Sequence, residues 1–382
     1  MGSQAADAAT RSDGWKRVDP QSVGVDAKQL EAIDAYLRAH PDSLVDSLVI
    51  ARCGAIVFER QYSHDYATIY AAQARADGSG LSLKDRDGEY NYFDARWHPY
   101  VHNTDLHTVQ SITKSITSVV YGVAVARGDF KASLDTPVLD YFKGRTVQFV
   151  DSRKQRMTIR NVLTMRSGLD WPDHGGYTSP ENAAMRMEHS QDWAQFVIDH
   201  PMAHDPGDHY FYSDGDAILA SHVFQKETGQ NIAEYAKKYL FAPLGIIDTY
   251  WKQTPAGIAD TESGMYMRPA DLAKIGELYL HNGRWEGRQL VSPEWVHQSV
   301  TDNAAQGNGG YGFYWRLRSQ GSEQDFIFSA HGFGGQGMHV NPKRNLVVVV
   351  YGWHIPKEGT AQEDILKRVL AATSTTSCPA AQ

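Results

Sequence analysis

The hydrophobic positions of this chain recur at helical spacing in some segments and form short β-rich runs in others. Apolar residues three or four apart predict helices over 26–39, 111–127, 269–281 and 361–372. Two β-rich runs enclose the Cys53-Gly54 turn and predict a hairpin over 47–59. Further strand-like runs lie toward the C-terminus, over 311–317, 326–328, 337–340 and 346–351.

The order of these elements predicts the fold class. Consecutive strands with short connections favour an antiparallel sheet, whereas residues 130–260 mix short helices and turns. We therefore predict an α/β (α+β) fold, an antiparallel sheet flanked by helices with a mostly helical domain inserted. The predicted domains are 15–107 together with 263–382 for the sheet, and 108–262 for the helical part. Residues 62–107 lack a clean period, and this long loop or insertion is expected to shape a cleft.

Composition excludes several classes of partner. The 382 residues include 37 Lys and Arg against 45 Asp and Glu, a net charge of −8 without any basic block, so nucleic acid is not expected as a partner. No apolar run approaches the roughly 20 residues of a membrane span. The expected partner is a small molecule, and the oligomeric state, monomer or dimer, stays open.

Two cysteines, Cys53 and Cys378, are too few for a disulfide framework or a cysteine-based zinc site. They form either one bridge or two free thiols. No cofactor is expected, because the chain has no phosphate-binding glycine loop and no dinucleotide fingerprint. No metal is expected either, since one histidine-rich stretch matches no zinc spacing; it holds His98, His102, Asp105 and His107.

The first residues, Met1-Gly2-Ser3, read like an expression scar. The compartment therefore stays open: periplasmic or secreted if a native leader was removed, and cytoplasmic otherwise.

The strongest chemical signal is Ser111-Ile112-Thr113-Lys114. Residues three apart share a helix face, and the helix start offers free N–H groups and a positive dipole end. A buried lysine can lose its proton, so Lys114 could deprotonate Ser111 and make it a nucleophile. The alternative is an ordinary solvated helix face, because the tetrapeptide is common.

Two further segments carry candidate chemistry. Tyr212 and Asp214 follow a Pro-Gly turn, and a tyrosine beside an ammonium group can act as general base and acid; the alternative is a core tyrosine with a satisfied hydroxyl. The glycine-rich segment 331–337 can bring backbone N–H groups close to an oxyanion; the alternative is a glycine bulge or hairpin. Asp170, Asp173 and His174 line the cleft or form a turn.

In this order the three segments resemble the penicillin-recognising serine hydrolases. Within them, the chain looks like class C β-lactamase-related proteins, namely family VIII-type esterases and the 6-aminohexanoate-dimer (nylon-oligomer) hydrolase group. The resemblance runs from about residue 15 to 372, supported by stretches at 158–168, 241–245, 271–276 and 293–295. It implies a β-lactamase/transpeptidase-like fold.

The resemblance also implies roles for individual residues. Ser111 would be the nucleophile, Lys114 its proton partner and Tyr212 the proton shuttle. The oxyanion donors would be the N–H groups of Ser111 and Phe333, or of Gly334 if the register is one residue later.

Two positions depart from the family pattern. Asp214 stands where the family commonly has Asn, and an acid beside Lys114 favours the ammonium form. Ala330-His331-Gly332 replaces Lys-Thr-Gly, and the loss of that cation favours esters or amides without a negative group. Asp214, His331, Gly332 and Gly334 are the expected substrate-binding or supporting residues.

The predicted function is that of a serine hydrolase that forms an acyl-enzyme, and the preferred hypothesis is a carboxylesterase. The alternatives are a β-lactamase, a D-amino-acid peptidase or a hydrolase of amide oligomers of the 6-aminohexanoate-dimer type. A non-catalytic, penicillin-binding-like sensor is the alternative of another class. The lack of a Gly-x-Ser-x-Gly elbow argues against an α/β-hydrolase.

Overall fold

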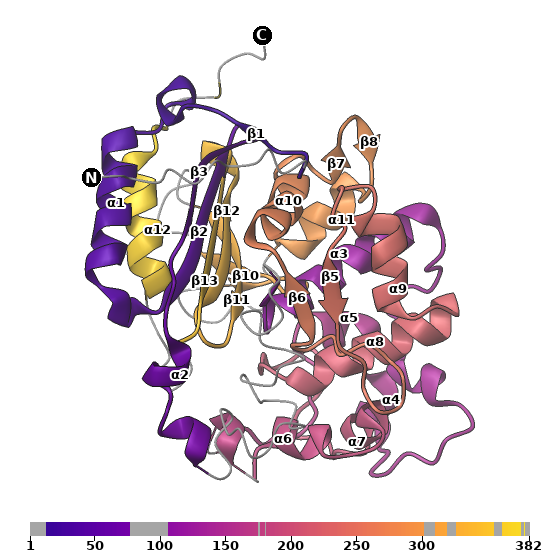
Figure 1. Ribbon diagram of the computed structural model, residues 1–382. Coiled ribbons are helices and arrows are strands. Elements are labelled where there is room, and N and C mark those ends of the chain that lie inside the picture. Colours follow the sequence, from indigo (N-terminus) through magenta and orange to yellow (C-terminus); the bar gives the residue numbers. More distant parts are fainter. Residues whose placement is uncertain are drawn as a thin grey trace.

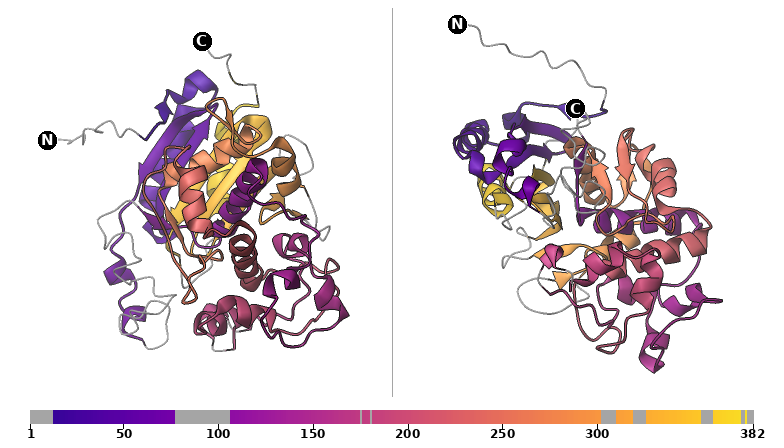
Figure 2. Two further views of the ribbon diagram at one scale, coloured as in Figure 1. Left: turned by 90° about the vertical axis from the view of Figure 1, so that its right-hand side faces the viewer. Right: turned by 60° about the horizontal axis from the view of Figure 1, so that its bottom comes forward.

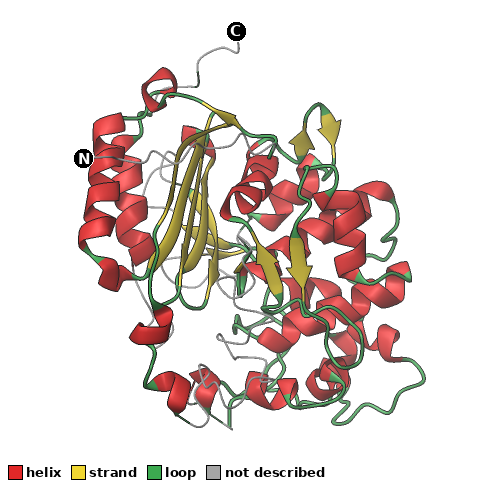
Figure 3. Cartoon of the chain, in the orientation of Figure 1, coloured by secondary structure: helices red, strands yellow, loops and turns green. Residues whose placement is uncertain are grey.

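The central feature is a twisted sheet built from both ends of the chain. The structure is a computed structural model that describes residues 13–76, 106–174, 176–179, 181–301, 310–318, 326–354, 361–375 and 378. In spatial order the strands are β1 (Lys16–Arg17), β3 (Ala55–Gln61), β2 (Val45–Arg52), β13 (Leu346–Gly352), β12 (Gln336–Asn341), β11 (Ile327–Gly332), β10 (Arg316–Arg318) and β9 (Gly310–Tyr311). Every neighbouring pair is antiparallel except β1 with β3. The predicted antiparallel sheet is thus confirmed (Figure 3).

Helices cover both faces of this sheet (Figure 1). On one face lie α1 (Ala27–Ala39) and α12 (Ala361–Ala372), close to their predicted ranges. The other face carries α10 (Pro269–Leu280) and α3 (Ile112–Arg127). Figure 2 shows the same arrangement from two other sides.

The middle of the chain supplies the helical half. Its helices are α4 (Ser152–Arg156), α5 (Ile159–Leu163), α6 (Ala183–Glu188), α7 (Trp193–Ile198), α8 (Asp214–Thr228) and α9 (Ile232–Ala236). The other elements are two helices and two small sheets. The helices are α2 (Tyr66–Ile69) and α11 (Pro293–Ser299). One sheet consists of β4 (His107–Thr108), β6 (Met265–Met267) and β5 (Thr249–Trp251), and the other of β7 (Arg284–Trp285) and β8 (Arg288–Gln289).

Helix α3 joins the two halves. Its residues are buried from Ile112 to Ala124, and one continuous apolar core includes Val49 of β2, Val120 of α3 and Phe224 of α8. Because α3 is packed on all sides, its first turn is held rigidly between the sheet and the helical half. Among the described helices, none is long and apolar enough to cross a bilayer.

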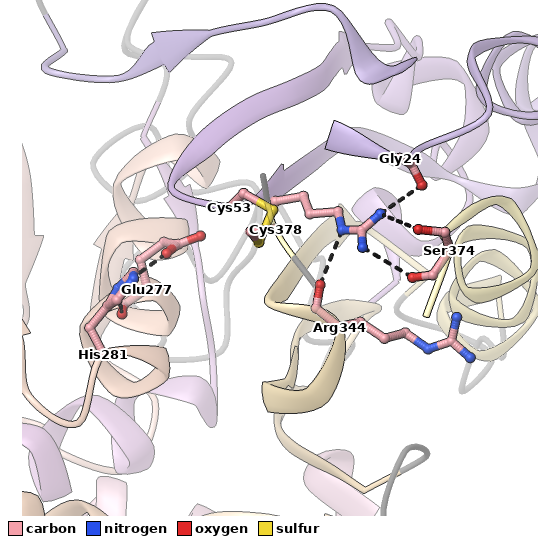
Figure 4. Close-up of a disulfide and its surroundings, with 8 residues drawn as sticks. Gly24, Cys53, Glu277, His281, Arg344, Ser374 and Cys378 are labelled. Carbon is pink, nitrogen blue, oxygen red and sulfur yellow. Dashed lines mark hydrogen bonds and ion pairs between the residues drawn. A yellow bond between two sulfur atoms is a disulfide. The ribbon is translucent and has the colours of Figure 1, made fainter. Parts of the chain in front are cut away.

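Of the two alternatives for the cysteines, the structure shows the bridge: Cys53 and Cys378 form a disulfide, with their Cα atoms 5.7 Å apart (Figure 4). Cys53 lies in the β2–β3 hairpin turn, and the segment after α12 folds back to meet it. Arg52, fully buried, anchors the same segment by donating to the carbonyl oxygens of Gly24 at 2.6 Å and Ser374 at 3.1 Å.

One predicted strand is wrong. Residues 311–317 do not form a single strand, because β9 ends at Tyr311 and β10 begins at Arg316. Tyr314 between them has a φ of +61°, which breaks the extended chain, and its N–H donates to the carbonyl of Leu163. The predicted 62–107 loop contains α2 and β4, and residues 77–105 lie outside the described part.

Candidate active site

Ser111 lies at the start of α3 and its hydroxyl is not used as a helix cap. The preceding residue, Gln110, has a φ of +47°, so the chain bends sharply into the helix. Ser111 already has helical angles, φ −61° and ψ −6°, and its side chain accepts no cap hydrogen bond. Within the described part of the chain, its backbone N–H has no acceptor. The local backbone therefore leaves both the hydroxyl and the N–H of Ser111 available.

Lys114 lies one turn further on and is 1% exposed. Its Nζ donates to Ser111 Oγ at 3.0 Å, to Asp214 Oδ1 at 2.7 Å and to the Glu262 carbonyl at 2.8 Å. A lysine ammonium has three donors, and all three are used. Burial disfavours the charge, but Asp214 and the other acidic neighbours outweigh it and raise the pKa of Lys114 above its ordinary value. Lys114 is therefore an ammonium that donates to Ser111.

Asp214 is positioned by the start of α8. Ser213 caps this helix, its Oγ accepting from the N–H of Asp216 at 3.1 Å. Asp214 is thus the first helical residue, where a carboxylate interacts favourably with the helix dipole. Its Oδ2 accepts from the hydroxyl of Tyr177 at 3.2 Å. One carboxylate therefore joins Lys114 to an aromatic residue from the segment between α5 and α6.

Tyr212 lies on the extended segment that leads into α8. The N–H of Phe211 donates to the Met165 carbonyl at 2.9 Å and fixes this segment beside α5. The Nζ of Lys114 is 5.0 Å from the centre of the Tyr212 ring. In the described part of the structure, the Tyr212 hydroxyl has no hydrogen-bond partner. The structure thus brings Ser111, Lys114 and Tyr212 together, with the hydroxyl of Tyr212 available.

The glycine-rich segment closes the site from the sheet side. Strand β11 ends at Gly332, where a β-carbon would collide with the carbonyl oxygen of Val109. Only glycine lets the strand approach the residues just before Ser111 this closely. Phe333 and Gly334 lie in the turn to β12, and Gly334 has a φ of +93°.

The two candidate oxyanion residues of that turn have different surroundings. The Phe333 ring lies edge-on to Tyr177, with ring centres 5.2 Å apart. The Gly334 carbonyl accepts from the N–H of His354 at 2.7 Å. The choice between the N–H groups of Phe333 and Gly334 stays a prediction.

His331 does not replace the missing lysine as a cation. Burial lowers its pKa well below the ordinary value, and the charges of His339 and two arginines lower it further. The rings of His331 and His339 lie 5.2 Å apart, and His339 is bonded to Ser329 at 3.0 Å. His331 is therefore a neutral group beside β12.

Sequence reasoning did not single out three residues that surround the site. Tyr177 comes from an irregular segment without periodicity, Glu262 from a turn, and Arg316 from the stretch that was predicted as one strand. The Cζ of Arg316 is 5.6 Å from the centre of the Tyr212 ring. Burial raises the pKa of Glu262 well above its ordinary value. Nothing in the local sequence marks these positions, because long-range folding alone brings them to Ser111.

The other candidate residues have structural partners. His107 is bonded to Asp46 Oδ2 at 3.0 Å, and Asp173 accepts from Asn182 at 2.6 Å. The other members of the histidine-rich stretch, His98, His102 and Asp105, lie outside the described residues. Across the described ranges, no three His, Cys, Asp or Glu side chains form a group that could hold a metal ion.

Comparison with known proteins gives the class. The family model described as Beta-lactamase matches residues 33–372. This match covers most of the chain, so the chain belongs to the Beta-lactamase family, and the resemblance drawn from the three motifs is confirmed.

Individual relatives are more distant. The chain is 23% identical to the 6-aminohexanoate-dimer hydrolase of Paenarthrobacter ureafaciens over 64% of this chain and 65% of that protein, just under two thirds of its length. A family VIII carboxylesterase has the same fold, with a TM-score of 0.63, 14% identity and coverage of 92% of this chain and 98% of that one. The octameric penicillin-binding protein homologue from Pyrococcus abyssi gives a TM-score of 0.62, 17% identity and coverage of 92% and 78%.

Proposed function

We propose that this protein is a carboxylesterase that acts on small-molecule esters through an acyl-enzyme. The observation that carries the proposal is the hydrogen bond from Lys114 Nζ to Ser111 Oγ, 3.0 Å long, at a helix start where the Ser111 hydroxyl makes no cap. A hydroxyl held in this way beside a cation is a candidate nucleophile.

In the proposed reaction, Ser111 Oγ attacks the ester carbonyl and its proton passes to the Tyr212 oxygen. As the C–O bond breaks, the Tyr212 hydroxyl gives its own proton to the departing alcohol, so that Tyr212 relays a proton and stays neutral. Lys114 already donates all its protons, so its role is to hold the Ser111 oxygen and to stabilise negative charge on the neighbouring oxygens. Water then attacks the acyl-enzyme and passes a proton to Tyr212 while Tyr212 gives its own proton to Ser111 Oγ, which releases the acid and restores the Ser111 hydroxyl.

The negative oxygen of each tetrahedral intermediate needs two donors. We assign the N–H of Ser111 and that of Phe333, with Gly334 as the alternative. Supporting this assignment, Gly332 lets β11 approach Val109 and Gln110, the two residues just before Ser111.

A second candidate is hydrolysis of a linear amide. The relative from Paenarthrobacter ureafaciens, named a 6-aminohexanoate-dimer hydrolase, favours it. Acylation by an amide needs the same nucleophile. The leaving amine must also be protonated more fully than a leaving alcohol, and Tyr212 would supply that proton.

A substrate panel tests the proposal. The wild type, Ser111→Ala and Tyr212→Phe should be compared on p-nitrophenyl acetate, nitrocefin, a D-alanyl-D-alanine peptide and the linear 6-aminohexanoate dimer. Ser118→Ala is the matched control, since Ser118 is a buried serine on the same helix, seven residues beyond Ser111. We expect ester hydrolysis by the wild type and the control, and a loss of at least about 1,000-fold in Ser111→Ala. Full ester hydrolysis by Ser111→Ala would overturn the proposal, and activity on the amide alone would favour the second candidate.

We further propose an oxidising compartment, the periplasm or the cell exterior. The Cys53–Cys378 disulfide supports this, because such bonds persist mainly outside the reducing cytosol. Fractionation of the natural host, with antibody detection, tests the location.

A further inference from the structure

The charges around Ser111 leave one cation without a partner among the described residues. Lys114 is neutralised by Asp214, 2.7 Å away. Burial raises the pKa of Glu262 and lowers that of His331, so it disfavours the charged form of both side chains. The remaining charge is the guanidinium of Arg316, which has no carboxylate or carbonyl partner in the described part of the chain.

Arg316 is held firmly at the edge of the site. It is the first residue of β10, where it pairs with Ser329 of β11 on one side and Tyr311 of β9 on the other. The hydroxyls of four tyrosines lie near enough to interact electrostatically with its side chain: Tyr177, Tyr210, Tyr212 and Tyr311. The rings of Tyr210 and Tyr311 are 5.0 Å apart and pack together beside it.

The side chain nevertheless remains exposed to solvent. A guanidinium that is always charged, exposed and surrounded by phenol groups can take a carboxylate through two parallel hydrogen bonds. Tyrosine hydroxyls are suitable additional donors to the same anion.

We propose that Arg316 binds a carboxylate on the leaving-group half of the substrate. This inference rests on the proposed function, in which Tyr212 protonates the leaving group. Since the Arg316 guanidinium lies 5.6 Å from the Tyr212 ring, the half of the substrate beside Tyr212 is also the half beside Arg316. Arg316 is then a specificity-determining residue, and the preferred substrates are esters or amides of hydroxy or amino acids.

This inference reverses one expectation from the sequence. The missing lysine of the third motif argues for substrates without a negative group. The structure instead places a cation on the neighbouring strand, β10, where the sequence motif gives no sign of it.

Three esters locate the anion. 4-Acetoxybenzoate carries the carboxylate on the leaving group, its methyl ester carries none, and monophenyl succinate carries it on the acyl half. We expect the wild type to have the highest kcat/KM for 4-acetoxybenzoate, with the difference mainly in KM. In Arg316→Gln, the ratio of kcat/KM for 4-acetoxybenzoate to that for its methyl ester should fall by roughly 10- to 100-fold.

Two further variants make the test specific. Arg316→Lys keeps the charge but loses the planar fork, so its ratio should lie between those of the wild type and Arg316→Gln. Arg318→Gln is the control, because Arg318 lies on the same strand but is paired with Glu363; its ratio should equal that of the wild type.

The outcomes are distinct. An equal loss on both acetoxybenzoate esters in Arg316→Gln, or a wild type that prefers the methyl ester, would overturn the role of Arg316 and leave the esterase proposal standing. A preference for monophenyl succinate that disappears in Arg316→Gln would place the anion on the acyl half and contradict the proposal. A wild type that hydrolyses none of the three esters would overturn the esterase proposal and this inference with it.

Discussion

Replacing Asp214 by asparagine separates the two roles that Lys114 could have, a charged donor or a neutral base. The substitution keeps the shape of the side chain and removes its charge. In the wild type, burial opposes the charge on Lys114 but Asp214 and its acidic neighbours outweigh burial, so the pKa of Lys114 is raised. Without Asp214, burial at 1% exposure dominates, and we expect the pKa of Lys114 to fall below its ordinary value.

The size of the effect follows from the burial of the pair. Removing one partner of a buried ion pair costs about 3–5 kcal/mol when the other stays charged. Lys114 in the variant can instead lose its proton, so the cost depends on pH. A lysine whose pKa is lower in the folded than in the unfolded state reduces the free energy of unfolding. The reduction is largest at pH values below the folded-state pKa, and it shrinks as pH rises toward the unfolded-state pKa. We therefore expect the melting temperature of Asp214→Asn to fall below that of the wild type more at pH 6 than at pH 10.

Activity distinguishes the two roles. If Lys114 works as an ammonium, kcat/KM of Asp214→Asn on p-nitrophenyl acetate should be about 10- to 100-fold lower at pH 8. It should recover partly at lower pH, where Lys114 regains its proton. The wild-type profile should lack this alkaline loss, because its raised pKa keeps Lys114 charged.

Asp216→Asn is the matched control for these profiles, since Asp216 is a buried carboxylate two residues further along α8 that makes no ion pair with Lys114. An Asp214→Asn variant that is as active as the wild type at pH 8, and more active as pH rises, would refute the ammonium role. That result would show that neutral Lys114 is the base.

Three other predictions concern the strand approach, the disulfide and a buried acid. Gly332→Ala should force β11 away from Val109 and lower kcat by at least about 10-fold with little change in secondary structure, as checked by kinetics and circular dichroism; unchanged kcat would contradict the close approach. Reducing Cys53–Cys378, which closes a loop across 325 residues, should destabilise the fold by up to about 6 kcal/mol, seen as a lower melting temperature in dithiothreitol; an unchanged melting temperature would be the contrary result. Burial raises the pKa of Glu277 from 4.5 to about 8, so the fold should lose stability, at most ~5 kcal/mol, as pH rises from about 4.5 to 8. Glu277→Gln should raise the melting temperature at pH 9 and leave it unchanged at pH 4, and an equal shift at both would argue against the raised pKa.

Much of the fold is readable from the sequence because its signals are local. The stripe of Leu30, Ile33 and Leu37 predicts α1, and Asp26 caps it where the apolar pattern begins. The apolar run 346–351 predicts β13, which the structure extends by one residue to Gly352. The aromatic residues of 311–317 have strand propensity and predict one strand, but the backbone turns at Tyr314, whose N–H bonds to the distant Leu163 carbonyl.

The residues of the candidate site also divide into those that local sequence signals predict and those that only long-range folding brings together. Ser111 and Lys114 are predictable since three positions on a helix fix their proximity. Tyr212 and Asp214 come from the resemblance, because a sequence separation of 100 between Lys114 and Asp214 carries no geometric information in itself. Arg316 is missed since only strand pairing brings it near Tyr212.

The central claim is that Ser111 becomes acylated during turnover. The direct measurement is acid quenching of the wild type during hydrolysis of p-nitrophenyl butyrate, followed by proteolysis and mass spectrometry of the peptide that contains Ser111. The account predicts a butyryl group on Ser111, with none on that peptide in Ser111→Ala, which should also be inactive. A butyryl group on another residue, or undiminished hydrolysis by Ser111→Ala, would contradict it.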